Sequence, residues 1–177
     1  MSAEIVPRWE WRTFGDAFGS ADDRLGALSP ERVEESDEVY LLSLASDASV
    51  KIRDGLMDVK QLEQVNGDGL EQWRPIMKAA YPLSTADARA VMAALRVDAA
   101  PVGRAEYSLD ELIDELVEPT AELAAVNVHK RREHYTVGGC MAERSEVRTD
   151  EGARRTIAVE SEDPARVIAA VRELGPL

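Results

Sequence analysis

Two alternating stretches flank the dipeptide Asp54-Gly55, and this arrangement limits the fold more than any other feature of the sequence. The two stretches are 49–53 and 56–65, and apolar and charged residues alternate in 50–53 and again in 57–60. A period of two is typical of a strand with two unlike faces, and Asp-Gly favours a tight turn between antiparallel strands. The sequence therefore predicts a β-hairpin in which apolar residues take one face and charged residues take the other.

The rest of the chain indicates further strands with helices between them. We expect strands over 4–14, 33–45, 49–53, 56–65, 123–137, 140–148 and 154–161, and helices over 16–28, 84–95, 108–118 and 163–174. The segment 70–80 is ambiguous, because Pro75 cannot donate to a regular ladder. Most connections are hairpin-like, so the sheet should be antiparallel and should either form a sandwich or close into a barrel. The prediction is one α+β domain over 1–177.

Composition excludes several classes of function and favours one compartment. The formal net charge of −13 argues against general binding of nucleic acids or anionic membranes, because both require a basic face. Cys140 is the single cysteine of the chain, so no disulfide can form within it. The segment 1–10 lacks the apolar core of a signal peptide, and no apolar run is long enough to cross a membrane. We expect a cytoplasmic protein.

Basic residues recur at every second position of several predicted strands, and side chains two apart on a strand share a face. These residues are Arg8, Arg12, Lys51, Arg53, Lys60, Lys130 and Arg132. Two orientations fit this pattern: the basic faces are solvated on the outside, or they line one interior. In the second case the like charges would repel one another until a polyanion neutralised them, and arginine suits phosphate oxygens through paired hydrogen bonds.

The order of the charged motifs resembles that of the CYTH family, also called triphosphate tunnel metalloenzymes. The opening E-x-E-x-K strand of that family is matched by 8–12, which reads R-W-E-W-R, and its paired basics are matched by Lys51 and Arg53. Lys60 matches a basic residue on the hairpin return, and 130–132 matches a later K-x-R strand. The closing E-x-E strand is matched by 158–160, which reads A-V-E and precedes the last predicted helix.

The resemblance implies an antiparallel eight-stranded tunnel that binds a triphosphate or a related phosphorylated small molecule. Members of the family hydrolyse triphosphates or make cyclic AMP with Mg²⁺ or Mn²⁺ held by tunnel carboxylates. By resemblance Glu10 and Glu160 are the metal ligands and the catalytic carboxylates. The phosphate contacts by resemblance are then Arg12, Lys51, Arg53, Lys60, Lys130 and Arg132, and Arg8, on the strand face of Arg12, is a further predicted substrate contact.

The chain departs from the family pattern at two carboxylates. Arg8 stands where the family has its first glutamate, and Ala158 stands where the closing motif has its first. A shifted register would bring in Glu4 or Glu143 instead. Three hypotheses stay open: a metal-dependent triphosphatase, an inactive polyanion-binding sensor or scaffold, and a protein-interaction module that uses the acidic outer surface.

Two further groups have alternative interpretations. Trp9 and Trp11 are expected to pack under a helix, with base stacking as the alternative. The apolar stripe over 109–116 forms core or serves a homodimer.

Overall fold

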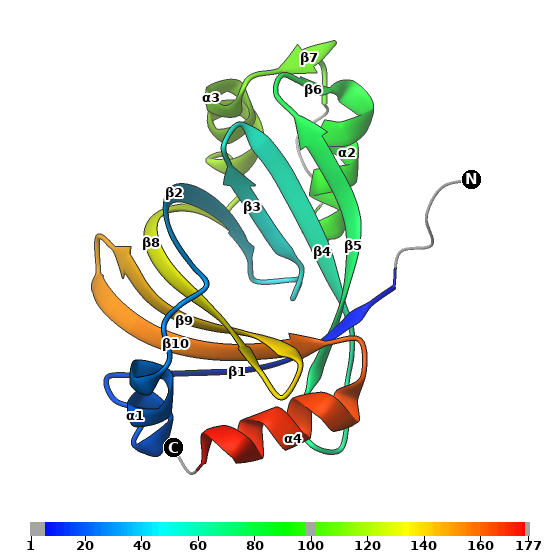
Figure 1. The fold of residues 1–177 in the computed structure, drawn as a ribbon. Helices are drawn as coiled ribbons and strands as arrows, with labels where there is room; N and C mark the ends of the chain where they lie inside the picture. Colours follow the sequence, from blue (N-terminus) through cyan, green and yellow to red (C-terminus); the bar gives the residue numbers. More distant parts are fainter. Residues whose placement is uncertain (1–5, 98–101, 176–177) are drawn as a thin grey trace. The chain divides into compact units, whose positions relative to one another are not determined.

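The computed structural model describes residues 6–97 and 102–175, and in this part of the chain eight strands close into an antiparallel barrel (Figure 1). The strand order around the barrel is β1-β10-β9-β8-β2-β3-β4-β5. The barrel strands are β1 (Arg8–Gly15), β2 (Arg32–Ser43), β3 (Ser49–Arg53), β4 (Leu56–Val65), β5 (Glu71–Ala80), β8 (Leu123–Val137), β9 (Cys140–Thr149) and β10 (Gly152–Ser161). Of the sandwich and barrel that the sequence left open, the chain therefore forms the barrel.

The remaining elements are helices and one short separate ladder. The helices are α1 (Ser20–Ala27), α2 (Thr85–Ala94), α3 (Leu109–Leu112), which continues into the π-helix η1 (Ile113–Val117), and α4 (Pro164–Leu174). Two short strands, β6 (Leu83–Ser84) and β7 (Glu106–Tyr107), pair with each other and were not predicted from the sequence. Side-chain caps begin α2 at Ser84, α3 at Ser108 and α4 at Asp163, because each accepts a backbone N–H of the first turn.

The chain divides into two compact units, and four of the long strands run from one unit into the other. Unit 1 consists of Met1–Ser36, Glu63–Arg74 and His129–Leu177, and unit 2 consists of Asp37–Leu62 and Pro75–Val128. In unit 1, helices α1 and α4 pack on the strands β1, β9 and β10 around a core that includes Leu25, Ile157 and Leu174. Trp9 and Trp11 pack against this core, as the sequence predicts.

Unit 2 has a core of its own, between the β3–β4 hairpin and the helices α2 and α3. Val50, Ile52, Met57 and Val59 are buried in it together with apolar residues of the two helices. Leu109, Leu112 and Leu116 of the predicted apolar stripe belong to this core or pack against it, so the interpretation as core is confirmed. The alternation along the hairpin thus separates an apolar face under the helices from a charged face.

Local features explain where the prediction succeeded and where it was wrong. Asp54 and Gly55 both have positive φ, 52° and 70°, which is the geometry of the tight hairpin turn that this dipeptide favours. The segment 70–80, which the sequence left ambiguous because of Pro75, contains the strand β5, and Pro75 does not interrupt this strand. The pairing of β5 with β1 ends at Trp73 opposite Arg8, where β1 begins, so Pro75 lies beyond the positions that need an amide donor for β1.

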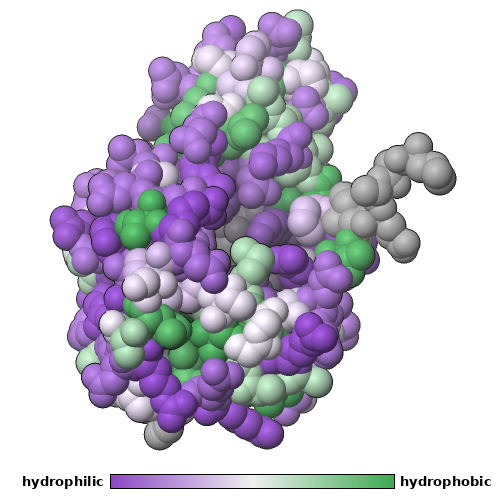
Figure 2. All heavy atoms as spheres, in the orientation of Figure 1, coloured by the Kyte–Doolittle hydropathy of each residue, from purple (hydrophilic) through white to green (hydrophobic). Residues whose placement is uncertain are grey.

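Hydrophilic residues cover most of the face shown in Figure 2, with smaller hydrophobic areas among them. This agrees with a chain that places its large aliphatic side chains in the two cores and carries an excess of acidic residues. Within residues 6–97 and 102–175, the helices are too short or too polar for any of them to cross a membrane.

Candidate functional site: a charged cluster on the inner strand face of unit 1

The strands of unit 1 have one apolar face and one charged face. Tyr135, Ala142, Ile157 and Val159 point into the core under α1 and α4. Their sequence neighbours point the other way, and cross-strand pairing aligns these on β1, β10, β9 and β8. Because the strands close into a barrel with helices outside, this second face is the inner one. It carries the charged cluster that consists of Arg8, Glu10, Arg12, Lys130, Arg132, His134, Glu143 and Glu160.

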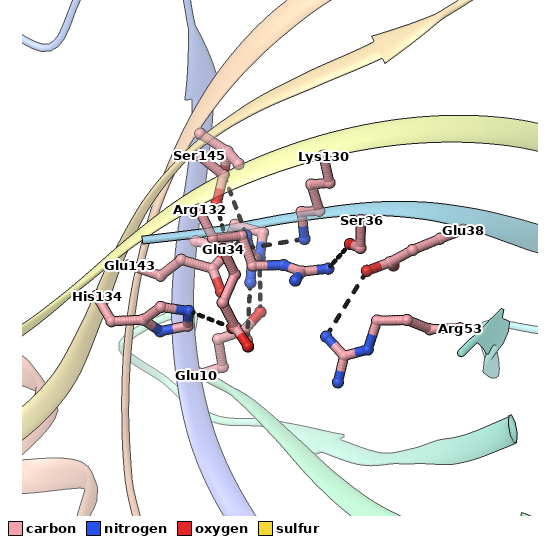
Figure 3. A network of polar contacts seen from close by, with 12 residues as sticks. Glu10, Glu34, Ser36, Glu38, Arg53, Lys130, Arg132, His134, Glu143 and Ser145 are labelled. Atoms are coloured by element: carbon pink, nitrogen blue, oxygen red, sulfur yellow. Dashed lines mark hydrogen bonds and ion pairs between the residues drawn. The ribbon is translucent and has the colours of Figure 1, made fainter. Parts of the chain in front are cut away.

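Glu143 on β9 is the point at which cations from two other strands meet. Arg12 Nη1 of β1 and Lys130 Nζ of β8 each lie 3.6 Å from Glu143 Oε1, and the Ser145 hydroxyl donates to the same oxygen at 2.6 Å. The side chains of Arg12 and Lys130 are 22% and 10% exposed, so most of their surface is removed from water. Figure 3 shows Lys130 of β8 on the same side as Glu143 and Ser145 of β9.

The surroundings of Glu143 decide its protonation. Burial alone would raise the pKa of this carboxyl group, but Lys130, Arg12 and the Ser145 hydroxyl outweigh burial and lower the pKa to about 2. Glu143 is therefore ionised at every physiological pH. An ionised carboxylate here offsets part of the repulsion among the basic side chains, in addition to the polyanion and the carboxylates of Glu10 and Glu160 that the sequence suggested for this role.

Burial has the opposite effect on the cations of β8. Lys130 is 8% exposed and Arg132 is 3% exposed. Burial lowers the pKa of both groups, although the carboxylate of Glu143 acts against this shift. Arg132 also donates from Nη2 to the Ser36 hydroxyl at 3.0 Å. A bound anion would favour the charged forms of both side chains, because it would supply negative charge where water is largely excluded.

The two proposed metal ligands are each engaged by an arginine. Arg12 holds Glu10 through two hydrogen bonds, from Nε at 2.9 Å and from Nη2 at 3.2 Å. Arg8 donates from Nη1 to Glu160 at 3.0 Å. In the described part of the chain, no three His, Cys, Asp or Glu side chains gather in a way that could hold a metal ion. The two carboxylates that the resemblance assigns to Mg²⁺ or Mn²⁺ are opposite each other in register, but each is already engaged by an arginine, so they do not present an open site for the ion.

His134 lies on the same face as Lys130 and Arg132 and is paired in register with Glu143. Its Nε2 is 2.9 Å from Glu34 Oε2, and Arg32 approaches the same carboxylate oxygen at 3.1 Å (Figure 3). Burial acts to raise the pKa of Glu34, but His134 and Arg32 together lower it. His134, Glu34 and Arg32 are more exposed than Lys130 and Arg132.

Unit 2 carries the other predicted phosphate contacts, on the face of its hairpin that is turned away from α2 and α3. Arg53 is paired in register with Glu38, whose side chain is fully buried, and Arg53 Nη1 lies 3.7 Å from Glu38 Oε1. Lys51 is opposite Tyr40 on β2 and opposite Asp58 on β4, and Lys60 is opposite Ser49. Arg53 therefore has an acidic partner within its own unit, and Lys51 and Lys60 lie opposite polar or acidic residues in register.

Sequence reasoning missed how fully the charged cluster is neutralised from within. Glu143 entered only as the product of a shifted register, and Glu34 was not connected with the cluster. The sequence did contain a signal for the contact between Glu143 and Ser145, because residues two apart on a strand share a face. The pairing of β9 with β8 and β10, however, is what brings Glu143 next to Lys130 and Arg12.

Comparisons with known proteins bear on the fold. No protein-family model matches the chain, and no curated protein matches it. An adenylate cyclase candidate from Bacillus halodurans is 12% identical, with 96% of this chain and 87% of that chain covered and a TM-score of 0.52. A conserved hypothetical protein from Pyrococcus furiosus is 17% identical, with 96% and 91% covered and a TM-score of 0.51.

A protein from Pyrococcus horikoshii gives a similar result, at 16% identity, 96% and 91% coverage and a TM-score of 0.51. At these identities the likeness concerns the architecture of the chain. It agrees with the closed antiparallel barrel of eight strands that the resemblance implies.

Proposed function

We propose that this protein binds a triphosphate or a related polyphosphate anion through the charged cluster, without a metal ion. The observation that carries the proposal is the burial of Lys130 and Arg132 on the inner strand face beside Arg12. Cations are rarely buried to this extent unless they are paired. Phosphate oxygens would compensate several of them at once, and arginine can bind them with two parallel hydrogen bonds.

The arginines support binding over metal-dependent hydrolysis. A hydrolytic metal requires carboxylates that are available as ligands, and here Glu10 is held by Arg12 and Glu160 by Arg8. Arg8 brings a positive charge to the place where the related pattern has a glutamate. It supplies electrostatic attraction for phosphate, but it cannot activate a water molecule as a metal does. The proposal is therefore a sensor or carrier of a polyphosphate.

The test is binding of tripolyphosphate in buffer that contains a metal chelator. At a hundredfold excess over the dissociation constant, ligand binding stabilises the folded state by about 2.7 kcal/mol, which a thermal or chemical unfolding experiment detects. Arg12→Gln is expected to weaken binding at least tenfold. Arg104→Gln is the matched control, because Arg104 pairs with Glu111 and Glu115 in unit 2, outside the cluster.

Two results would contradict the proposal. The first is the absence of any stabilisation by tripolyphosphate at millimolar concentration. The second is steady release of phosphate from tripolyphosphate with Mg²⁺ or Mn²⁺ that Glu160→Gln abolishes, since this would identify a metal-dependent hydrolase.

A further inference from the structure

Phe14 exposes an aromatic ring near the end of β1, two residues after Arg12 of the cluster. Its exposed fraction is 64%, and it is the one aromatic residue among the strongly exposed large hydrophobics of the described chain. Trp9 and Trp11 on the same strand pack against the core of unit 1. Phe14 therefore contributes little to the core, and its exposed ring is available to a ligand.

The position of Phe14 is tied to the charged cluster by strand geometry. Phe14 and Arg12 are two residues apart on β1, so they share a face with about 7 Å between their Cα atoms. Phe14 is paired in register with Thr156 of β10, which is 1% exposed. The Thr156 hydroxyl accepts a hydrogen bond from Arg12 Nη1 at 3.3 Å and donates to the Thr13 carbonyl at 2.7 Å. These contacts hold the guanidinium and the strand that carries the ring in one arrangement.

Residues of β9 and β8 lie in register with Phe14 and Thr156, on the same strand face. Thr156 is paired with Ser145 on β9, and Ser145 is paired with Arg132 on β8. Ser145 and Arg132 are 2% and 3% exposed. The inner strand face thus passes from an exposed aromatic ring, over two buried hydroxyl groups, to a buried cation. A ligand with a flat apolar end and a strongly anionic end would match this order.

We propose that Phe14 is a stacking platform for the base of a nucleoside polyphosphate whose phosphate groups bind the charged cluster. This inference rests on the proposed function and adds the chemical class of the organic group. Stacking on an exposed ring tolerates any base, because every base has a π-face, so the site selects nucleotides over inorganic polyphosphate without reading the base identity. Trp73, opposite Arg8, is engaged differently, because its indole N–H donates to Glu71 at 3.1 Å.

The experiment compares the dissociation constants of ATP and tripolyphosphate by calorimetry, in the presence of a chelator. Phe14→Ala is expected to weaken ATP binding about tenfold, the range of a single base stacked on an aromatic side chain. It should leave tripolyphosphate binding within about twofold of the unsubstituted protein, and Phe14→Trp should keep ATP binding. Leu28→Ala is the matched control, because Leu28 is an exposed large apolar residue of the same unit.

The outcomes separate this inference from the proposed function. If tripolyphosphate and ATP both bind and Phe14→Ala affects neither or both equally, the stacking role is wrong and the polyphosphate site stands. If neither ligand binds the unsubstituted protein, both proposals are wrong. Because Phe14 is exposed, the alanine variant should fold normally, and its unfolding midpoint should lie close to that of the Leu28→Ala control.

Discussion

Arg8 Nη1 donates a hydrogen bond to Glu160 Oε1 across a distance of 3.0 Å, so the residue that departs from the CYTH pattern neutralises a carboxylate that the pattern keeps. The side chains are 42% and 25% exposed, and water therefore screens the pair. A pair this exposed contributes little to stability. Its importance lies in the charge of the site, because a metal ion bound to Glu160 would have to compete with the guanidinium of Arg8.

Arg8→Glu should create a metal site that the unsubstituted protein lacks. The substitution removes the partner of Glu160 and adds a third carboxylate beside Glu10 and Glu160, on the same strand face. Carboxylates gathered in this way are the ligands that Mg²⁺ and Mn²⁺ prefer. We expect the affinity for Mn²⁺, measured by calorimetry or by electron paramagnetic resonance, to rise at least tenfold.

The control for this change is Arg154→Glu, which alters the net charge equally at an exposed position of β10. Equal gains in Mn²⁺ affinity for the two variants would mean that only the overall charge matters. Tight Mn²⁺ binding by the unsubstituted protein would show that the arginines do not block the site.

Glu143→Gln should strengthen polyphosphate binding while it weakens the folded state. The carboxylate competes with an anionic ligand for Arg12 and Lys130, both of which lie 3.6 Å from Glu143 Oε1. Removing its charge frees both cations for phosphate, and we expect the dissociation constant of tripolyphosphate to fall about tenfold. Glu146→Gln on the same strand is the control, because Glu146 pairs with the exposed Arg148. Weaker binding by Glu143→Gln than by this control would contradict the competition.

The stability difference between the unsubstituted protein and Glu143→Gln should depend on pH. The pKa of Glu143 is about 2 in the folded state against an ordinary value of 4.5, so ionisation stabilises the fold above pH 4.5 and this contribution is lost as the pH falls toward 2. A shift of this size corresponds to about 3 kcal/mol at pH 7 and to less than half of that at pH 3.

Urea unfolding of both proteins at pH 7, 5 and 3 measures this effect. The gap in unfolding free energy between them should shrink as the solution becomes more acidic. A gap that stays constant over this range would mean that Glu143 is not held ionised by its neighbours. Glu133, whose pKa is also lowered to about 2, is present in both proteins, so its contribution cancels in the comparison.

The sequence by itself determined the strands, their two faces and the tight turns between them. Asp54-Gly55 and the alternation on either side of it specify a hairpin through local φ/ψ preference and period, and Ser84 and Asp163 begin helices through hydrogen bonds within one turn. Each of these features depends on residues close together in the chain. The order of the basic motifs could also be recognised in the sequence, and through the family resemblance it indicated the barrel.

Only the tertiary structure decided which charges meet. Arg12 and Glu143 are 131 positions apart, and they come together because β1 pairs with β10 and β10 pairs with β9 in one register. The same pairing places Arg8 next to Glu160 and Phe14 opposite Thr156. A shift by one residue would turn every one of these side chains to the other face. Register between distant strands is set by the packing of the whole apolar face against α1 and α4, and no short segment of the sequence contains that information.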